Sequence, residues 1–130
     1  MPLQLNSLNH IALRTNRLEE SRRFYREVLG FKEIARPPFN FNGAWLYNAG
    51  IQIHLLEQPY DRMPDEINTR ENHIAFACPD LEAAEESLKR HGIPFKRNII
   101  PEWNTNQLFF RDPDGWLIEL GYYTVPIDKE

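Results

Sequence analysis

Two copies of one short pattern carry the residues best suited to chemistry in this 130-residue chain. The first is Asn9-His10-Ile11-Ala12-Leu13, and the second, Asn72-His73-Ile74-Ala75-Phe76, begins 63 positions later (72 − 9). A histidine followed by alternating small and large apolar residues is typical of a β-strand. The repetition indicates a duplicated module in which each copy delivers one imidazole to an equivalent place.

A second correspondence adds His54 and Glu119, which each stand four residues after a predicted turn glycine, Gly50 or Gly115. Both are predicted in the middle of a strand, where burying an unpaired polar group costs about 2–7 kcal/mol. Neighbouring strands lie about 4.8 Å apart, so their side chains can converge on one ion at about 2.0–2.2 Å from each ligand atom.

The candidate metal ligands are three imidazoles and one carboxylate: His10, His54, His73 and Glu119. This set suits a borderline divalent transition metal, namely Zn, Ni, Co, Mn or Fe(II), whereas calcium prefers oxygen ligands. Any one of these histidines taken alone is more often a satisfied core or surface residue. Three of the four histidines in the chain, however, occupy repeat-equivalent or ligand-facing positions, which favours a shared metal site. The fourth, His91, is explained by the dipole of the helix that it ends.

The elements that must position these groups begin with a predicted strand at residues 8–14, which carries His10. Asn16 is predicted to cap the following helix, with Glu19 in the capping-box position, and Gly30 to end it. Three further strands are predicted at residues 31–35, 44–47 and 51–56.

The second half of the chain repeats this order. Residues 73–76 are predicted as a strand, and Asp80 and Gly92 are predicted to begin and end a helix. Three further strands are predicted at residues 95–98, 108–111 and 116–120. Each half therefore reads strand–helix–strand–strand–strand.

This order predicts an α+β fold made of two tandem βαβββ modules within a single domain, residues 1–130. The segment between the halves contains two prolines and many charges without periodicity, so it is predicted to be a linker. The predicted parts are a first module at about 5–57, a linker at about 58–71, a second module at about 72–122 and a tail at 123–130.

The composition argues against several classes of partner. The chain has 15 basic and 19 acidic residues and a net charge of −4, so no basic surplus exists to neutralise phosphates. The single cysteine, Cys78, excludes an internal disulfide and fits a reducing compartment. The N-terminus lacks the regions of a signal peptide, and no run approaches the roughly 18 apolar residues that span a membrane. We therefore predict a soluble cytoplasmic protein with no nucleic-acid or membrane partner.

Several stretches resemble the vicinal-oxygen-chelate superfamily, and the resemblance runs from about Leu5 to Tyr122. The stretches that carry it are residues 8–11, 24–31, 72–76 and 110–120, with residues 42–46 and 51–56 typical of one subgroup. The chain is most similar to the glyoxalase I-like branch, whose members are often labelled lactoylglutathione lyase-like. The resemblance implies the glyoxalase/bleomycin-resistance/dihydroxybiphenyl-dioxygenase fold, in which two modules form a half-open barrel around one metal.

The resemblance also implies a chemistry. Superfamily members use the metal to bind two neighbouring oxygens and to stabilise an enediolate or a related oxyanion. In glyoxalase I, a carboxylate at a ligand position moves a proton between adjacent carbons of a glutathione hemithioacetal, and Glu119 would be that catalytic base here. The bacterial glyoxalase I pattern resembles His–Glu–His–Glu, so His54 replaces a carboxylate and leaves the site one unit more positive. Epimerases of the superfamily place a glutamine at the His54 position.

Three functions follow from these residues. The first is a metal-dependent glyoxalase I-like lyase or isomerase that acts on a small 2-oxo or glutathione-linked substrate, with glutathione as a co-substrate. The second leaves His54 outside the ligand set, as in Fe(II) extradiol-type dioxygenases and Mn-dependent thiol transferases of the fosfomycin-resistance type. The third is a non-catalytic ligand-binding or resistance protein.

The neighbours that share a face with the candidate ligands are the candidates for a small-molecule substrate pocket: Arg14, Trp45, Tyr47, Gln52, Gln107, Phe109 and Arg111. Arg14 or Arg111 could bind a substrate carboxylate, and a solvated arginine at a strand end is the alternative. The aromatic side chains are more often core residues than substrate contacts. The resemblance further implies a homodimer, in which the modules pair within one chain or exchange between chains.

Overall fold

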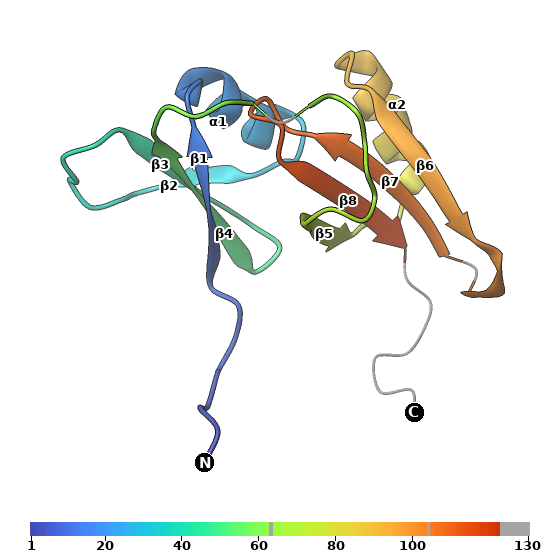
Figure 1. Ribbon diagram of the computed structural model, residues 1–130, viewed down its shortest axis with the longest axis horizontal. Coiled ribbons are helices and arrows are strands. Elements are labelled where there is room, and N and C mark those ends of the chain that lie inside the picture. Colours follow the sequence, from blue (N-terminus) through green and yellow to red (C-terminus); the bar gives the residue numbers. More distant parts are fainter. Residues whose placement is uncertain (63, 104, 123–130) are drawn as a thin grey trace. The chain divides into compact units, whose positions relative to one another are not determined.

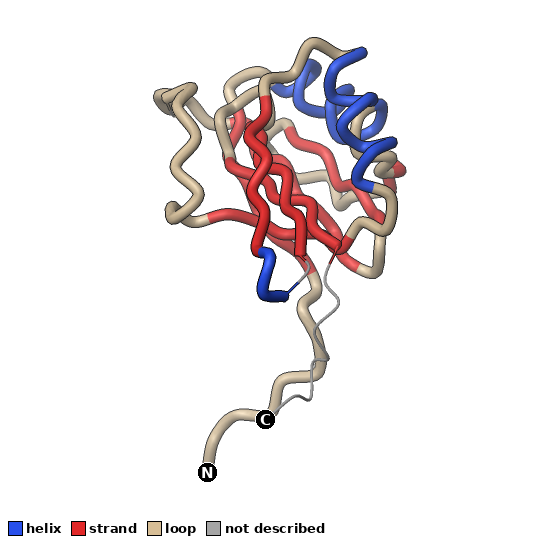
Figure 2. Tube along the Cα trace, turned by 90° about the vertical axis from the view of Figure 1, so that its right-hand side faces the viewer, coloured by secondary structure: helices blue, strands red, loops and turns tan. Residues whose placement is uncertain are grey.

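The computed structural model describes residues 1–62, 64–103 and 105–122, and it divides into two compact units, residues 1–61 and 62–130. Each unit contains a four-stranded mixed sheet and one α-helix (Figures 1 and 2). The boundary between the units lies inside the predicted linker. The predicted tail, residues 123–130, lies outside the described residues.

The first unit has the predicted βαβββ order. Its elements are β1 (His10–Thr15), α1 (Leu18–Glu27), β2 (Lys32–Ile34), β3 (Gly43–Asn48) and β4 (Ile51–Glu57). The sheet order is β1-β4-β3-β2, with β1 parallel to β4 and the other neighbours antiparallel. His54 of β4 stands opposite Ala12 of β1 and Trp45 of β3, so it occupies the middle of the sheet.

The second unit repeats this topology. Its elements are β5 (His73–Ala77), α2 (Leu81–Arg90), β6 (Phe95–Ile100), the 3₁₀ turn η1 (Pro101–Trp103), β7 (Thr105–Arg111) and β8 (Leu117–Tyr122). The sheet order is β5-β8-β7-β6, with β5 parallel to β8. The α+β fold of two βαβββ modules is therefore confirmed, while the metal site and the barrel that would enclose it stay predictions.

In each unit the helix covers one face of the sheet. Helix α1 contacts β3 and β4, and α2 contacts β7 and β8. The side chains between helix and sheet are large and fully buried, among them Tyr25, Leu46 and Ile53 in the first unit and Leu88 and Phe110 in the second. Burying a Leu, Ile or Phe side chain contributes about 1.5–3 kcal/mol. Because these side chains form the core between helix and sheet, the opposite face of each sheet can carry polar groups.

The two helices begin differently, and the predicted capping box at Asn16 is wrong. Helix α1 starts after Arg17, one residue later than a cap at Asn16 requires, and Arg17 makes no side-chain cap hydrogen bond. The Nδ2 atom of Asn16 donates to the carbonyl oxygen of Tyr60 at 3.1 Å. Helix α2 is capped as predicted, since the Asp80 carboxylate accepts a hydrogen bond from the backbone of Ala83 at 3.0 Å. Neither described helix is long and apolar enough to cross a membrane.

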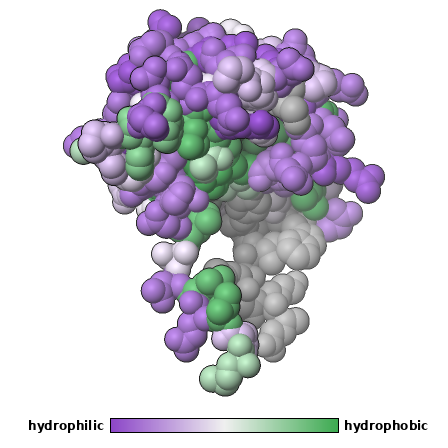
Figure 3. All heavy atoms as spheres, turned by 60° about the vertical axis from the view of Figure 1, so that its left-hand side comes forward, coloured by the Kyte–Doolittle hydropathy of each residue, from purple (hydrophilic) through white to green (hydrophobic). Residues whose placement is uncertain are grey.

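Exposed apolar side chains are concentrated before the first strand. Met1, Leu3, Leu5 and Leu8 are all more than half exposed, and residues 1–9 form no helix or strand. On the face shown in Figure 3, hydrophilic side chains cover most of the upper surface, and a hydrophobic area lies in the middle of the face.

The turn between β3 and β4 contains a strained residue. Ala49 has φ 54° and Gly50 has φ 82°, the consecutive left-handed pair typical of a type I′ hairpin. Left-handed backbone costs a non-glycine residue roughly 1–2 kcal/mol, and asparagine tolerates it better than alanine.

Replacing Ala49 by asparagine is therefore expected to raise the free energy of unfolding by about 0.5–1 kcal/mol, because Asn-Gly is the preferred sequence of this turn. Urea denaturation of the two proteins measures the difference. Ala49→Val is the control, since a β-branched residue in the same conformation should lower stability instead. Equal stability of all three proteins would contradict the assigned turn.

Candidate metal centre

The candidate ligands lie on the sheet face opposite the helix in both units. In β1, burial alternates as the sequence predicts: Leu13 and Thr15 are buried, whereas His10, Ala12 and Arg14 are exposed. The strand register places His10 opposite Gln52 and Ala12 opposite His54, on this same face. In the second unit, Ala75 and Phe109 stand on either side of Glu119 in the same way.

Three rings from adjacent strands form a stack in the first unit. The His54 ring lies between those of His10 and Trp45, with ring centroids 4.0 Å apart on each side and interplanar angles of 12° and 5°. His54 is 7% exposed, whereas His10 is exposed. The stack fixes the plane of the His54 ring and covers both of its faces.

Hydrogen bonds identify the unprotonated nitrogen of the two histidine rings. The His54 Nε2 atom lies 2.7 Å from Oε1 of Gln52, and the His10 Nδ1 atom lies 2.8 Å from Oδ1 of Asn9. An amide oxygen only accepts, so these two ring nitrogens carry the proton and donate. The lone pair available to a metal is then on Nδ1 of His54 and on Nε2 of His10.

Burial lowers the pKa of His54, and the nearby His10 lowers it further when that ring is charged. The native state therefore resists protonation of His54 below the pH at which the unfolded chain takes up the proton, about 6.5. Since the unfolded state binds more protons in this window, stability rises with pH and falls as pH drops below about 6.5.

We expect the metal-free protein to lose part of its unfolding free energy between pH 6.5 and the lower native pKa, and His54→Phe to lack that part. Phenylalanine can still stack between the two neighbouring rings and cannot take up a proton. Urea unfolding of chelator-treated protein at several pH values measures the slope. A wild-type slope retained in His54→Phe would contradict the assignment.

The second unit pairs an imidazole with a carboxylate. The His73 Nε2 atom lies 2.9 Å from Oε1 of Glu119, and His73 Nδ1 lies 2.8 Å from the carbonyl oxygen of Glu71. A carbonyl only accepts, so Nδ1 carries a proton and the lone pair of neutral His73 faces the carboxylate. Two acceptors in contact need a shared cation, either a proton or a metal ion. Two ligand atoms at about 2.0–2.2 Å from one ion and at right angles are about 3 Å apart, so the pair has the spacing of adjacent metal ligands.

The second oxygen of this carboxylate is also held. Oε2 of Glu119 accepts a hydrogen bond from Nε2 of Gln107 at 2.9 Å, and Oε1 of Gln107 accepts one from Nδ2 of Asn98 at 2.7 Å. Glu119 is 4% exposed, and the ring of Phe109 meets the His73 ring edge to face at 5.5 Å. The carboxylate is thus buried with a defined partner for each oxygen.

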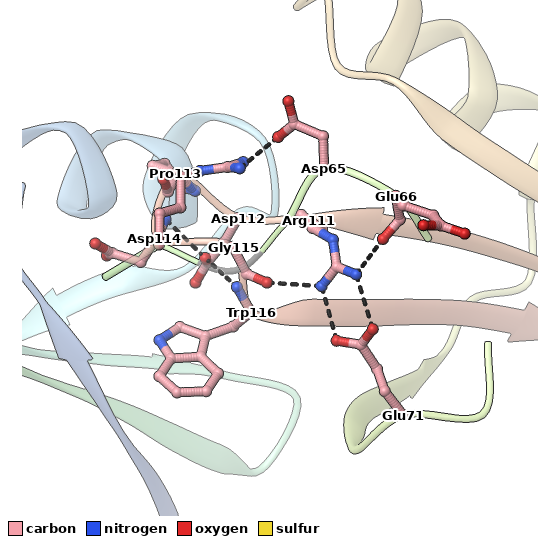
Figure 4. Close-up of polar contacts among 10 residues, drawn as sticks. Asp65, Glu66, Glu71, Arg111, Asp112, Pro113, Asp114, Gly115 and Trp116 are labelled. Carbon is pink, nitrogen blue, oxygen red and sulfur yellow. Dashed lines mark hydrogen bonds and ion pairs between the residues drawn. The ribbon is translucent and has the colours of Figure 1, made fainter. Parts of the chain in front are cut away.

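Arg111 closes a separate network at the end of β7 (Figure 4). Its two terminal nitrogens each lie 2.8 Å from one carboxylate oxygen of Glu71, and they also donate to the carbonyl oxygens of Gly115, at 2.8 Å, and Glu66. The Arg111 side chain is 5% exposed. These hydrogen bonds lower the pKa of Glu71 and raise that of Arg111. The guanidinium that the sequence suggested for a substrate carboxylate is therefore used to fasten residues 66–71 to the sheet.

Most of the other pocket candidates contact a neighbouring side chain, and Tyr47 is exposed. The Arg14 guanidinium lies over the Tyr60 ring, 4.9 Å from its centroid, and Tyr47 is 47% exposed. Trp45, Gln52, Gln107 and Phe109 all contact a candidate ligand, as described above. Sequence reasoning missed Glu71 and Asn98, because neither belongs to a repeated pattern.

Each unit thus brings together one pair of candidate ligands: His10 with His54, and His73 with Glu119. Over residues 1–62, 64–103 and 105–122, no group of three or more His, Cys, Asp or Glu side chains is close enough to hold an ion. The donors suit a divalent transition metal, but neither pair supplies the three protein ligands of a catalytic site. A site built from all four residues stays a prediction.

Known proteins are similar to this chain in sequence. Residues 7–120 match the Glyoxalase/Bleomycin resistance protein/Dioxygenase superfamily. The chain is 44% identical to glyoxylase I 4 of Arabidopsis thaliana over 125 residues, which cover 92% of this chain and 72% of that protein. It is 31% identical to lactoylglutathione lyase of Haemophilus influenzae, with 85% and 87% covered.

A solved structure shows the same fold at lower identity. The fosfomycin resistance protein of Listeria monocytogenes, crystallised with Mn(II), matches with a TM-score of 0.81 at 22% identity, over 94% of this chain and 95% of that one. The sequence matches and the fold of two βαβββ modules indicate the same family. The chain belongs to the glyoxalase/bleomycin resistance protein/dioxygenase superfamily.

Proposed function

We propose that the protein is a metal-dependent lyase or isomerase of the glyoxalase I type, acting on a small 2-oxo or glutathione-linked substrate. The observation that carries this proposal is the contact between Nε2 of His73 and Oε1 of Glu119, two candidate ligand atoms that lie 2.9 Å apart. Relatives that match over most of their length bear the name lactoylglutathione lyase, which supports a lyase rather than a binding protein.

The proposed metal ligands are Nε2 of His10, Nδ1 of His54, Nε2 of His73 and the carboxylate of Glu119. Because a metal lies near the plane of each imidazole that binds it, His10 must rotate out of its stack on His54 for both rings to bind one ion. When bound, a divalent transition metal would supply Lewis-acid polarisation of a substrate oxygen. Glu119 is the proposed base, since it is the one carboxylate in the set and can carry a proton between adjacent carbons. Trp45 is proposed to hold the His54 ring and Phe109 the His73 ring, and both are proposed to exclude water.

The direct test is turnover of a methylglyoxal–glutathione adduct by chelator-treated protein reloaded with Zn, Ni, Co, Mn or Fe(II). We expect isomerisation to the thioester with at least one of these metals and none after renewed chelation. Metal-loaded protein that turns over no such adduct would overturn the proposal.

A second candidate function is favoured by His54. Its Nε2 is engaged with Gln52 and its ring is covered on both faces, which suits a structural role beside a two-histidine, one-carboxylate site. Such a site fits Fe(II) dioxygenase or Mn-dependent thiol-transfer chemistry. His54→Phe separates the two candidates, because it should weaken metal binding in the first and leave it unchanged in the second.

We also propose that the protein works as a homodimer. The proposal rests on the family, and it is tested by sedimentation of the metal-loaded protein. If modules exchange between chains, dilution should lower metal affinity together with activity, whereas modules that pair within a chain should be insensitive to dilution.

A further inference from the structure

We propose that Gln107 is a positioning residue for Glu119 and that Asn98 sets the orientation of the Gln107 amide. The inference rests on the proposed function, because it concerns how the carboxylate is presented to a metal. Asn98 of β6 stands directly opposite Gln107 of β7, and Glu119 lies on the next strand, β8, opposite Phe109. Three adjacent strands therefore contribute one link each.

The donor and acceptor groups fix the direction of the hydrogen bonds from Asn98 through Gln107 to Glu119. An ionised carboxylate only accepts, so the NH₂ group of Gln107, rather than its oxygen, must face Glu119. The Gln107 oxygen then points to β6 and needs a donor, which Nδ2 of Asn98 provides at 2.7 Å. Reversing the Gln107 amide would place its oxygen against a Glu119 oxygen, and reversing the Asn98 amide would place its oxygen against the Gln107 oxygen.

The consequence for the candidate site is a fixed carboxylate. Gln107 holds Oε2 of Glu119 at 2.9 Å, which leaves Oε1 directed at Nε2 of His73. Because Glu119 is 4% exposed, water has little access to replace a lost partner. Groups that orient a metal ligand from outside the ligand set typically change metal affinity or activity by about 10–100-fold when they are removed.

Asn98→Asp gives the sharpest test, since residue 98 makes its bond to Gln107 rather than to Glu119. An aspartate at this position can only accept, so it should draw the NH₂ group of Gln107 toward β6 and turn the Gln107 oxygen against Glu119. The added negative charge would by itself strengthen the binding of a cation. Weaker metal binding in Asn98→Asp would therefore have the opposite sign to the electrostatic effect.

The experiment compares the affinity of chelator-treated proteins for Co(II), measured by competition with a chromophoric chelator. We expect Gln107→Met and Asn98→Asp to bind about 10–100-fold more weakly than wild type, and Asn98→Ala to lose less because it leaves the Gln107 amide unopposed. Lys96→Gln, which makes the same charge change on an exposed position of β6, should bind at least as tightly as wild type.

The outcomes separate the two proposals. Wild-type protein that binds no Co(II) would overturn the proposed metal function and this inference with it. Wild-type binding with equal affinity in Gln107→Met and Asn98→Asp would overturn the positioning role alone. Thermal melting of the metal-free variants checks folding, and Asn98→Ala, at a half-exposed position, keeps the test available if Gln107→Met or Asn98→Asp unfolds the unit.

Discussion

Replacing Glu119 by glutamine is expected to lower turnover of the adduct by about 10²–10⁴-fold while leaving the fold intact. Glutamine keeps the size of the side chain and can donate its NH₂ group to the free lone pair of His73, so the contact to β5 survives. It can neither carry the proton nor supply a negatively charged ligand. Steady-state kinetics at saturating metal measures the loss.

The control for this substitution is Glu82→Gln, which changes the same chemical group at an exposed position in the first turn of α2. It should keep wild-type turnover. A Glu119→Gln protein that turns over the adduct at the wild-type rate would remove the carboxylate from the proposed chemistry and leave only a structural role for it.

Arg111→Met is expected to lower the free energy of unfolding by at most about 3–5 kcal/mol, the cost of removing one partner of a fully buried ion pair, because the Glu71 side chain is 23% exposed. The substitution leaves the Glu71 carboxylate and the carbonyls of Glu66 and Gly115 without their shared donor. Urea denaturation measures the loss. Because the Glu71 carbonyl accepts from His73, metal affinity should fall together with stability.

Arg97→Met provides a matched comparison on the same sheet. Arg97 forms an ion pair with Glu85 at 2.9 Å, but its side chain is 43% exposed, so the expected loss is at most about 1 kcal/mol. Combining Arg111→Met with Glu71→Gln should cost less than the sum of the single changes, because the uncompensated carboxylate is then gone. An Arg111→Met protein no less stable than Arg97→Met would contradict the buried role.

The repeated histidine patterns were enough to predict the duplicated architecture, because hydrophobic alternation and turn glycines are local signals. The same repeat led from His54 to Glu119, which shares its position after the turn. The start of α1 was not predicted correctly in this way, since the helix begins after Arg17, one residue beyond the expected cap at Asn16. The Asp80 cap of α2 followed the sequence rule.

The hydrogen-bond partners of side chains on the ligand-bearing sheet faces were harder to predict from the sequence. Alternation predicted that Gln107 and Arg111 share a face with Glu119, but it could not show which group each one contacts. Glu71 precedes the repeated pattern, and its counterpart in the first module is Leu8, so the duplication gave no signal for it. Asn98 is similarly ordinary in sequence, and only the register of β6 with β7 reveals its contact.

The proposed metal site requires that the histidine pair of the first unit and the His73–Glu119 pair of the second bind the same ion. The most direct measurement is a Co(II) titration of chelator-treated wild type, His10→Ala and His73→Ala, followed by the visible absorption of the bound ion. We predict one ion per chain in the wild type and weaker binding of that ion in both variants. Unchanged affinity in either variant, or no binding by the wild type, would contradict the claim.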